Sequence, residues 1–411
     1  MIERVVVVGG GLAGFSAAAE LRRRGFDGRV TIVDGGTEPY DRPPLSKDYL
    51  AGTTDRAGLS LARTGWYEAQ EVALELGRRA DRIDASSAAV LLEDGTELSA
   101  DAVILAPGGV PRPLAIPGGD LPGVLTLRTH DDADELRERL GRGARVLVVG
   151  AGLIGAEVAS TASILGAEVV LADPARLPLI DAVGPEIAAF LHGQHAANGI
   201  ALSPGYAAAV ERRGGKALTV TMSSGAEIEV DVVVAGIGIN PDLGLAISSG
   251  LQTNHGIVVD DRRRTSRPNV FAAGDAARVV LPDGTAVRRA EHWEAAQVSG
   301  RAAAAGLLGA EPDPEGAPWF WTDRHGVHVE AIGDMAAAGD LVVRGGVGAP
   351  PFSVFRVQHD RVVGAVSVDD SLAVRAARRM IEQAVPVDRE RLADTGVPLK
   401  ALLKAGARTS A

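Results

Sequence analysis

The stretch Val5-Val6-Val7-Val8-Gly9-Gly10-Gly11-Leu12-Ala13-Gly14 decides the fold. Four successive β-branched residues are typical of a buried parallel strand, and Gly9, Gly11 and Gly14 have the G-x-G-x-x-G spacing that opens a following helix. The first glycine permits a tight turn, the second lets the backbone approach a pyrophosphate, and the third lets the helix lie close to the strand. Phosphates would then lie at the positive end of that helix.

An acidic residue follows at the distance that this motif requires. Asp34 ends a second apolar strand, 29–34, twenty positions after Gly14. Its carboxylate can accept hydrogen bonds from the hydroxyl groups of a ribose. A glycine-rich turn alone is a weak signal, because such turns have many uses. Strand, glycines, helix and acid together predict that this unit binds a dinucleotide.

The same pattern occurs a second time. After a linker rich in Pro and Gly (107–122), the stretch 145–157 places Gly150, Gly152 and Gly155 at the same spacing behind an apolar strand. Two such units predict two bound nucleotides, one held permanently and one exchangeable. Each copy is followed by a hairpin pattern and a further apolar strand, at 89–98 with 102–106 and at 218–228 with 232–235.

The second copy also has its acid. Asp173 ends the strand 167–173, eighteen residues after Gly155. A carboxylate there accepts a hydrogen bond from the 2′-hydroxyl of NADH and repels the 2′-phosphate of NADPH, so Asp173 favours NADH. Arg176, three residues further on, leaves a phosphate contact open as the alternative.

Composition limits the remaining possibilities. A chain of 411 residues is long enough for two or three domains, and its net charge of -11 disfavours nucleic acid or an anionic membrane as a partner. The absence of cysteine excludes disulfides, thiolate metal sites and a C-x-x-C redox relay. No apolar run approaches the roughly 18 residues that span a bilayer. We therefore expect a soluble, cytoplasmic protein.

Two further stretches are candidates for ligand contacts. In the segment 40–47, Arg42 has the chemistry to pair with a pyrophosphate, and Lys47 offers a compact positive charge that favours the anionic reduced state of a redox ring. A proline-stiffened surface loop is the alternative. In the segment 269–277, Asp275 follows a short strand and a glycine turn, where it is suited either to hold a polyol or to cap a helix.

A series of motifs resembles the FAD-dependent NADH:ferredoxin reductases that serve bacterial cytochromes P450 and ring-hydroxylating dioxygenases. The resemblance covers nearly the whole chain, and its narrowest motifs are R-P-P-L-S-K and P-W-F-W. One departure is Thr322-Asp323-Arg324, where the family tends to Ser-Asp-Gln. The motifs are GxGxxG (9–14), R-P-P-L-S-K (42–47), GxGxIGxE (150–157), G-I-G-I-N-P (236–241), R-T-S-x-P-x-V-F-A-A-G-D (264–275), E-H-W-E-A-A (291–296) and P-W-F-W (318–321).

The resemblance implies an α/β fold with two Rossmann-type dinucleotide-binding domains, of the glutathione-reductase kind, and a C-terminal α+β domain. The FAD domain would be discontinuous, at residues 1–108 and 241–316. The NAD domain would be inserted at 109–240, and the C-terminal domain would occupy 317–411.

The resemblance also implies roles for individual residues. Lys47 and Glu157 would form a pair near the nicotinamide and the flavin, with an ordinary surface salt bridge as the alternative. The residues that would contact FAD are Gly9, Gly11, Gly14, Asp34, Arg42, Lys47, Asp275 and Trp293. Those that would contact NADH are Gly150, Gly152, Gly155 and Asp173.

The implied reaction is hydride transfer from NADH to tightly bound FAD, followed by one-electron transfers to a 2Fe-2S ferredoxin that feeds a cytochrome P450 or a dioxygenase. Because the chain lacks cysteine, electrons must leave directly from the flavin, either to such a carrier or to oxygen. The alternatives are an NADH oxidase, a redox-sensing NADH-binding flavoprotein and a rubredoxin reductase. Arginines at 262–264, 267 and 288–289 are candidate basic patches for an acidic ferredoxin.

Overall fold

The computed structural model describes residues 2–84 and 87–403. The chain forms two compact units, and each is assembled from segments that are far apart in the sequence. The first unit comprises Met1–Pro43, Asp55–Val110 and Ile239–Glu315, and the second comprises Pro44–Thr54, Pro111–Gly238 and Gly316–Ala411.

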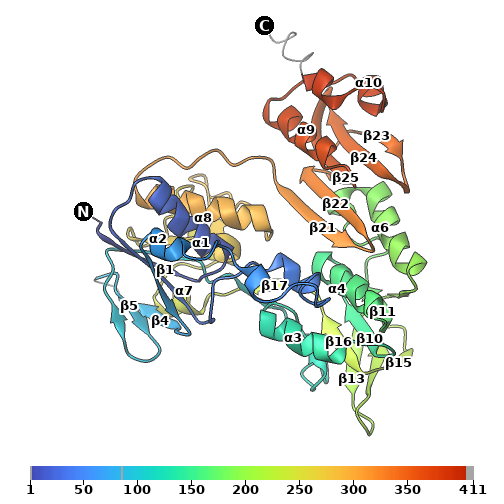
Figure 1. Ribbon diagram of the computed structural model, residues 1–411, viewed down its shortest axis with the longest axis horizontal. Coiled ribbons are helices and arrows are strands. Elements are labelled where there is room, and N and C mark those ends of the chain that lie inside the picture. The colour runs from blue at the N-terminus through green and yellow to red at the C-terminus, as the bar shows by residue number, and fades with distance from the viewer. Residues whose placement is uncertain (1, 85–86, 404–411) are drawn as a thin grey trace. The chain divides into compact units, whose positions relative to one another are not determined.

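The first unit is built on a parallel sheet with β1 (Arg4–Val8) at its centre (Figure 1). β1 pairs with β2 (Arg29–Asp34) on one side and with β7 on the other, so its valines are at most 8% exposed. This confirms the buried parallel strand that the four valines predict. The strand order is β19-β7-β1-β2-β3, with β3 at Val72–Leu76, β7 at Ala102–Leu105 and β19 at Val270–Ala272.

Two helices cover this sheet and pack against each other. They are α1 (Leu12–Arg23), which follows the first glycine turn, and α8 (Trp293–Leu307), which returns from a distant part of the chain. Their contact is made of small residues, so the backbones approach closely: a Cβ on Gly300 would stand 2.1 Å from the carbonyl oxygen of Ala13. The residues that the two helices bury include Ala17, Ala18, Leu21, Ala303, Ala304 and Leu307.

The remaining elements of the first unit are short. A three-stranded antiparallel sheet confirms the hairpin predicted at 89–98, with β4 at Ala80–Ile83, β5 at Val90–Leu92 and β6 at Glu97–Leu98. The other elements are η2 (Ala57–Leu59), α2 (Trp66–Ala69), β17 (Ile239–Pro241), α7 (Gly244–Ser248), β18 (Ile257–Val259), η3 (Gly274–Ala276) and β20 (Ala277–Val279).

The second unit repeats the strand, glycine turn, helix and strand of the first. β10 (Arg145–Val149) leads into α4 (Leu153–Ile164) and pairs in parallel with β11 (Glu168–Asp173) and β16 (Val232–Ala235). The strand order is β12-β11-β10-β16-β9, with β12 at Ala201–Pro204 and β9 at Val124–Leu125. The predicted hairpin at 218–228 is confirmed by β13 (Ala207–Glu211), β14 (Leu218–Met222) and β15 (Glu227–Val230).

The same unit contains a five-stranded antiparallel sheet from the C-terminal part of the chain, in the order β21-β22-β25-β24-β23. Its strands are β21 (Trp319–Arg324), β22 (Val327–Gly333), β23 (Asp340–Gly346), β24 (Ala349–Gln358) and β25 (Arg361–Val368). Helices α9 (Ser371–Glu382) and α10 (Arg389–Ala393) pack on it around a core of its own. The other elements are η1 (Pro43–Ser46), α3 (His130–Arg139), α5 (Ile180–Val183) and α6 (Pro185–Ala197). The short β8 (Gly109–Pro111) has its first two residues in the first unit and its last residue in the second.

The fold class predicted from the sequence is confirmed: two Rossmann-type units and a C-terminal α+β domain. Among residues 2–84 and 87–403, no helix has the length and apolar character needed to cross a membrane. In the same ranges, no group of three or more histidines and carboxylates is arranged to hold a metal ion.

Candidate functional site

The first glycine turn has no room for side chains at the motif positions. Gly9 has a φ of +109°, and a Cβ there would stand 2.1 Å from the carbonyl oxygen of Ala106. A Cβ on Gly14 would stand 1.9 Å from the carbonyl oxygen of Gly9, because α1 begins directly against the turn. Glycine at these two positions is therefore a steric requirement of the turn.

The mouth of this turn presents donors and positive charge. Gly11 is the N-cap of α1 and has no side chain to bond the first helical N–H groups. Nη1 of Arg42 lies 2.7 Å from the place where a Cβ on Gly11 would stand, so the guanidinium is directly beside the helix start. Uncapped N–H groups, a helix N-terminus and an arginine fit the pyrophosphate of a dinucleotide.

Asp34 lies beside the same turn. Oδ2 of Asp34 accepts a 2.5 Å hydrogen bond from the N–H of Gly10, and Oδ1 accepts a 2.6 Å bond from the N–H of Gly36. A carboxylate has about four acceptor sites, so two remain for a ligand. The contacts place an acceptor at the end of β2, next to the turn.

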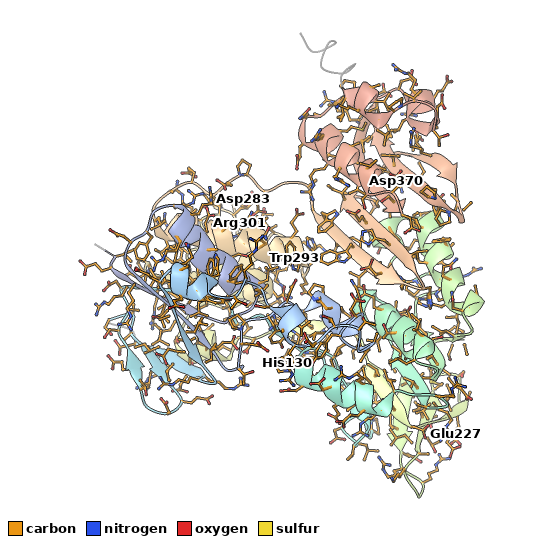
Figure 2. All side chains as sticks on the ribbon, in the orientation of Figure 1. His130, Glu227, Asp283, Trp293, Arg301 and Asp370 are labelled. Carbon is orange, nitrogen blue, oxygen red and sulfur yellow. The ribbon has the colours of Figure 1, made fainter. Side chains whose placement is uncertain are left out.

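Asp275 and Trp293 come from the far end of the first unit. Asp275 lies inside the short η3, and η3 lies against α1, since a Cβ on Gly274 would be 2.9 Å from Cβ of Ala13. Asp275 is not the cap of the short helix that follows the glycine turn, because the N-cap of η3 is Ala273 and Asp275 is the second residue of η3. The N-cap of α8 is His292, whose ring accepts from Ala295 N–H. Trp293 is the first residue of α8 (Figure 2). Its indole Nε1 donates to the carboxylate of Asp41 at 3.0 Å.

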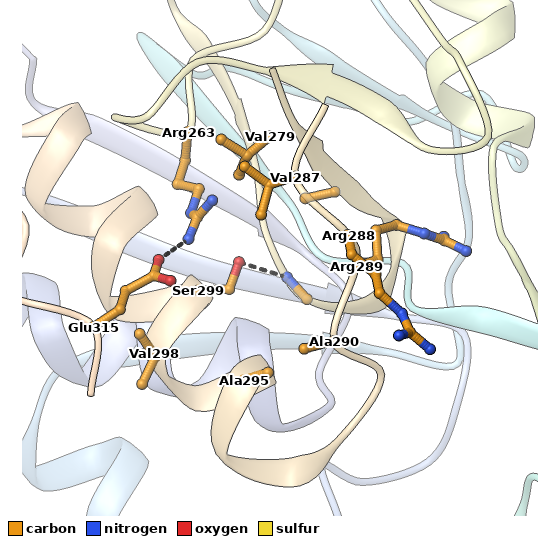
Figure 3. A pocket seen from close by; sticks show the side chains of 12 residues that line it. Arg263, Val279, Val287, Arg288, Arg289, Ala290, Ala295, Val298, Ser299 and Glu315 are labelled. Carbon is orange, nitrogen blue, oxygen red and sulfur yellow. Dashed lines mark hydrogen bonds and ion pairs between the residues drawn. The ribbon is translucent and has the colours of Figure 1, made fainter. Parts of the chain in front are cut away.

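A small pocket lies beside η3 and α8 (Figure 3). Its apolar lining includes Val279, Val287 and Val298, and the N–H of Gly274 donates to Oγ of Ser299 at 3.0 Å. Arg289 lies at its edge and donates to the backbone oxygen of Asp275 at 2.9 Å. This bond fixes the loop between η3 and α8.

The second glycine turn is a close copy of the first. Gly150 has a φ of +99°, and a Cβ on it would stand 2.5 Å from the carbonyl oxygen of Gly236. A Cβ on Gly155 would stand 1.9 Å from the carbonyl oxygen of Gly150. Gly152 differs, because a Cβ there would meet no heavy atom within 4 Å. The open space at Gly152 is what a glycine that admits a ligand should show.

Asp173 repeats the arrangement of Asp34. Its Oδ2 accepts a 2.8 Å bond from Ala151 N–H, and its Oδ1 accepts a 2.7 Å bond from Ala175 N–H. The second sheet thus also ends with an anchored carboxylate beside its glycine turn.

Lys47 and Glu157 meet inside the second unit. Lys47 Nζ lies 3.4 Å from Glu157 Oε1, and their side chains are only 13% and 4% exposed. Oγ of Ser46 donates to Glu157 Oε2 at 2.5 Å, and Oγ1 of Thr322 donates to Oε1 at 2.7 Å. Burial raises the pKa of Glu157, and the Lys47 charge and the two hydroxyl groups oppose that rise. The pair is not an ordinary surface salt bridge.

The nearer partner of Lys47 is one that the sequence did not reveal. Lys47 Nζ lies 2.9 Å from Oδ2 of Asp323 and 5.1 Å from the ring centroid of Trp321. Trp321 in turn stacks on Trp319, with ring centroids 5.1 Å apart. Asp323 is 276 residues from Lys47, so spacing along the chain gave no signal. The alternation Trp319, Trp321, Asp323 on one strand face was the only available clue.

The predicted basic patch at 262–264 does not form. Arg263 is 6% exposed and pairs with Glu315, while Arg262 pairs with Glu311. Arg264 lies 3.9 Å from Asp260. Each of the three arginines therefore has an acidic partner, two of them distant in sequence and one four residues away. Arg288 is exposed, whereas its neighbour Arg289 pairs with Glu291 at 2.8 Å.

Comparison with known proteins places this geometry in a family. The model of the pyridine nucleotide-disulphide oxidoreductases matches residues 3–300, and that of the reductase C-terminal domain matches residues 319–403. Rhodocoxin reductase of Rhodococcus erythropolis is 36% identical over 96% of this chain and 93% of its own length. Putidaredoxin reductase of Pseudomonas putida is 35% identical over 98% of this chain and 97% of its own length.

Solved structures agree. The covalent complex of putidaredoxin reductase with putidaredoxin matches with a TM-score of 0.89 and 34% identity, covering 98% of this chain and 99% of that chain. A ferredoxin reductase from Rhodopseudomonas palustris matches with a TM-score of 0.90 and 33% identity, covering 97% and 99%. The chain therefore belongs to the pyridine nucleotide-disulphide oxidoreductases, and within them to the ferredoxin reductases of cytochrome P450 and dioxygenase systems.

Proposed function

We propose that this oxidoreductase is an FAD-containing, NADH-dependent ferredoxin reductase. It takes a hydride from NADH and delivers single electrons to a 2Fe-2S ferredoxin of a cytochrome P450 or dioxygenase system. The observation that carries the proposal is the pair of equivalent glycine turns, each beside an anchored aspartate, in a chain without cysteine. Bound FAD supplies a ring that accepts two electrons as a hydride and releases them one at a time.

The first turn holds FAD. Gly9, Gly11 and Gly14 bring the backbone and the start of α1 to the pyrophosphate, and Arg42 balances its charge from the side. Asp34 receives the ribose hydroxyl groups with its remaining acceptor sites. Asp275 and Trp293 approach from η3 and α8, which suits them to the ribityl chain and the ring.

The second turn holds NADH. Gly150 and Gly155 set the turn geometry, and the open space at Gly152 admits the pyrophosphate. Asp173 accepts from the 2′-hydroxyl of the adenosine ribose, and its negative charge disfavours the 2′-phosphate of NADPH.

Lys47 and Glu157 act together on the charge that the reaction creates. Lys47 lies between two carboxylates, those of Glu157 and Asp323, and the aromatic face of Trp321. Because its side chain is only 13% exposed, solvent screens the electrostatic field of the ammonium less than at the surface. Its ammonium would stabilise negative charge on a flavin ring bound beside it. Glu157, held by Ser46 and Thr322, keeps a carboxylate oxygen 3.4 Å from that ammonium.

The electron acceptor follows from chemistry and from the relatives. Disulfide reductases of this layout pass electrons through a cysteine pair, which this chain lacks. The relatives include a putidaredoxin reductase solved in complex with putidaredoxin and the ferredoxin reductase components of chlorobenzene and benzene dioxygenases. A direct transfer from flavin to a small 2Fe-2S protein is the function that fits both facts.

The division into domains belongs to this proposal. We assign residues 1–108 and 241–316 to the FAD domain, 109–240 to the NAD domain and 317–411 to the C-terminal domain. The last assignment is supported by the core between one face of the C-terminal sheet and helices α9 and α10, while the other face of the sheet shares a core with α5 and α6. We place the protein in the cytoplasm, where NADH is available, and fractionation of cells that produce it tests the assignment.

The decisive experiment is NADH-driven reduction of cytochrome c by the FAD-loaded protein, with and without purified 2Fe-2S ferredoxins. We expect strong stimulation by at least one ferredoxin and little NADH consumption with oxygen alone. Full NADH consumption with oxygen alone would instead identify an NADH oxidase. A long-lived NADH complex with slow turnover and no stimulation would identify a redox sensor, and stimulation only by rubredoxin would change the acceptor.

A further inference from the structure

One face of the β21–β22 hairpin presents a row of charged and aromatic side chains. The strands pair with Asp323 opposite His328 and Trp321 opposite Glu330. Since alternate residues of a strand share a face, Trp319, Trp321 and Asp323 lie together with His328 and Glu330. The hairpin therefore extends the surroundings of Lys47 toward the surface, because the side chain of His328 is 40% exposed.

His328 makes two contacts that require its charged form. Nδ1 lies 2.5 Å from Oδ1 of Asp323, and Nε2 lies 3.4 Å from Oε1 of Glu330. Each carboxylate oxygen is an acceptor, so both ring nitrogens must carry protons, and only the imidazolium does so. The hydrogen bond to Asp323 and that to Glu330 raise the pKa of His328 to about 10.

Asp323 is held from two sides. His328 occupies Oδ1, and the Lys47 ammonium lies 2.9 Å from Oδ2. Burial pushes the pKa of Asp323 upward, but the His328 hydrogen bond and the Lys47 charge outweigh it and lower that pKa to about 2. The Asp323 side chain is 41% exposed. If His328 were removed, Lys47 would be the one cation of this row that still pairs with Asp323.

Three other charged groups in and around this row, Glu157, Arg324 and Glu330, determine how the charge of His328 affects Lys47. Glu157 faces Lys47 from α4, and the buried Arg324 acts on Glu157 from the opposite face of β21. Glu330 faces His328 and accepts from Nε1 of Trp319 at 2.9 Å. Two carboxylates, Glu157 and Asp323, compete for one ammonium, and His328 offsets the second of them.

We propose that His328 is a positioning residue for Lys47: it fixes Asp323 through Oδ1, so that Oδ2 holds the ammonium, and its charge offsets that of Asp323. This inference rests on the proposed function, in which Lys47 stabilises the reduced flavin. With His328 in place, the charges of Glu157 and Asp323 are balanced by two cations, Lys47 and His328, rather than by Lys47 alone. A neutral residue at position 328 leaves excess negative charge beside Lys47.

The charge state of His328 is tested first, by NMR of the FAD-loaded protein labelled with ¹⁵N-histidine. His328→Gln identifies the signal by its disappearance. We expect both ring nitrogens of His328 to remain protonated at pH 8, and we expect Asp323→Asn to make the ring titrate at lower pH. A His328 ring that is already neutral at pH 8 would overturn the proposal.

The effect on Lys47 is tested by stopped-flow reduction of the bound flavin by NADH and by the flavin midpoint potential. We expect His328→Gln to slow reduction about tenfold, the share of one charge-assisted hydrogen bond, and to make the potential more negative. His328→Lys, which restores the cation, recovers most of both. His359→Gln, at an exposed histidine in the turn between β24 and β25, leaves both unchanged.

These experiments distinguish a failure of the role given to His328 from a failure of the proposed reductase function. If His328→Gln matches His359→Gln in rate and potential while Lys47→Met is slow, the inference is wrong and the proposed function stands. If Lys47→Met is as fast as the unmodified protein and no ferredoxin stimulates turnover, the proposed function fails, and the inference fails with it.

Discussion

Oδ2 of Asp173 accepts a 2.8 Å hydrogen bond from the backbone N–H of Ala151, the residue between the first two glycines of the second turn. Asp34 makes the matching 2.5 Å bond to Gly10 in the first turn. Each carboxylate therefore stabilises its own turn and, in the proposed function, its own ribose. Because the two copies lie in different units of the chain, their removal should affect different nucleotides.

Asp173→Ala should weaken NADH binding and spare FAD. Loss of a ribose hydrogen bond and of the anchor on Ala151 should raise the KM for NADH about tenfold, with kcat within about twofold. Steady-state kinetics with ferricyanide as acceptor measure both constants, and absorbance near 450 nm measures FAD content. An unchanged KM would show that this carboxylate does not contact the ribose.

Asp34→Ala should have the opposite pattern. Removal of its bonds to Gly10 and Gly36 loosens the first turn, so FAD should dissociate more readily. We expect a lower ratio of flavin to protein after dialysis, and near-normal KM for NADH once FAD is added back in excess. Equal FAD retention by the variant and the unmodified protein would contradict the assignment of the first turn to FAD.

The glycines of the second turn allow a sharper comparison. Gly152→Ala adds a Cβ that meets nothing within 4 Å, so the protein should fold with an unchanged Tm. NADH affinity should nevertheless fall at least about tenfold, because the methyl group occupies the space assigned to the pyrophosphate. Calorimetric titration of NADH and thermal unfolding measure the two effects separately.

Gly155→Ala is the structural control for that comparison. Its Cβ would stand 1.9 Å from the carbonyl oxygen of Gly150, so α4 must move away from β10. We expect a lower Tm, corresponding to about 1–3 kcal/mol of lost stability, together with weaker NADH binding. If Gly152→Ala binds NADH normally, the pyrophosphate does not approach this turn.

Much of the fold was accessible from local patterns. β1 and β10 were predicted from runs of valine and leucine. The glycine turns were predicted from the spacing of glycines at positions where a Cβ would clash with the backbone. These features depend on residues close together in sequence, where periodicity and turn chemistry are informative. The acids Asp34 and Asp173 were found for the same reason.

The surroundings of Lys47 were only partly accessible. Glu157 was named because the family resemblance implied its role, but Ser46, Thr322 and Asp323 contact the pair through tertiary folding. No spacing rule links positions 276 residues apart. The acidic partners of Arg262 and Arg263 were not accessible from the sequence either, since Glu311 and Glu315 lie about fifty residues further along the chain.

The Lys47–Glu157 pair predicts strong coupling. Both side chains are nearly buried, so loss of the Lys47 charge leaves Glu157 without its ammonium, and loss of the Glu157 charge leaves Lys47 with Asp323 as its carboxylate. Lys47→Met and Glu157→Gln should each slow flavin reduction by NADH, and the double variant should be much faster than the product of the two effects implies. Stopped-flow rates for the four proteins measure the coupling, and additive effects would mean that the two residues act independently.

A second buried chain of hydrogen bonds lies next to this pair. Nη1 of Arg324 lies 3.5 Å from Nε2 of His195, His195 Nδ1 lies 2.8 Å from Nε2 of His325, and His325 Nδ1 lies 3.4 Å from Oγ of Ser160. Because a guanidinium can only donate, His195 must accept at Nε2 and donate from Nδ1, and His325 must then accept at Nε2. Both histidines are therefore neutral in the folded protein.

This chain makes folding stability depend on pH. Burial, with the charge of Arg324, lowers the pKa of His195 to about 3 and that of His325 to about 4. Unfolded histidine has a pKa near 6.5, so between about pH 6.5 and 4 the unfolded state binds more protons than the folded state. Each histidine then costs the folded state at most about 1.4 kcal/mol per pH unit as the pH falls.

The whole protein is unfolded in urea at a series of pH values from 8 to 4, and circular dichroism monitors the transition. The urea midpoint of the second unit's unfolding is the quantity compared. Below pH 6.5 we expect this pair of histidines to cause a progressive loss of stability as the pH falls. Between pH 7 and 8 we expect a smaller loss as the pH rises, because His328, whose pKa is raised to about 10 in the folded protein, stays protonated there but loses its proton on unfolding. His325→Asn removes one of the two titrating rings and should flatten the decline, although its stability at pH 8 is lower because Ser160 and His195 lose a partner. His359→Gln, at an exposed ring, should leave the slope as it is. A slope identical in the His325→Asn variant would mean that carboxylates, rather than this pair of histidines, set the acid sensitivity.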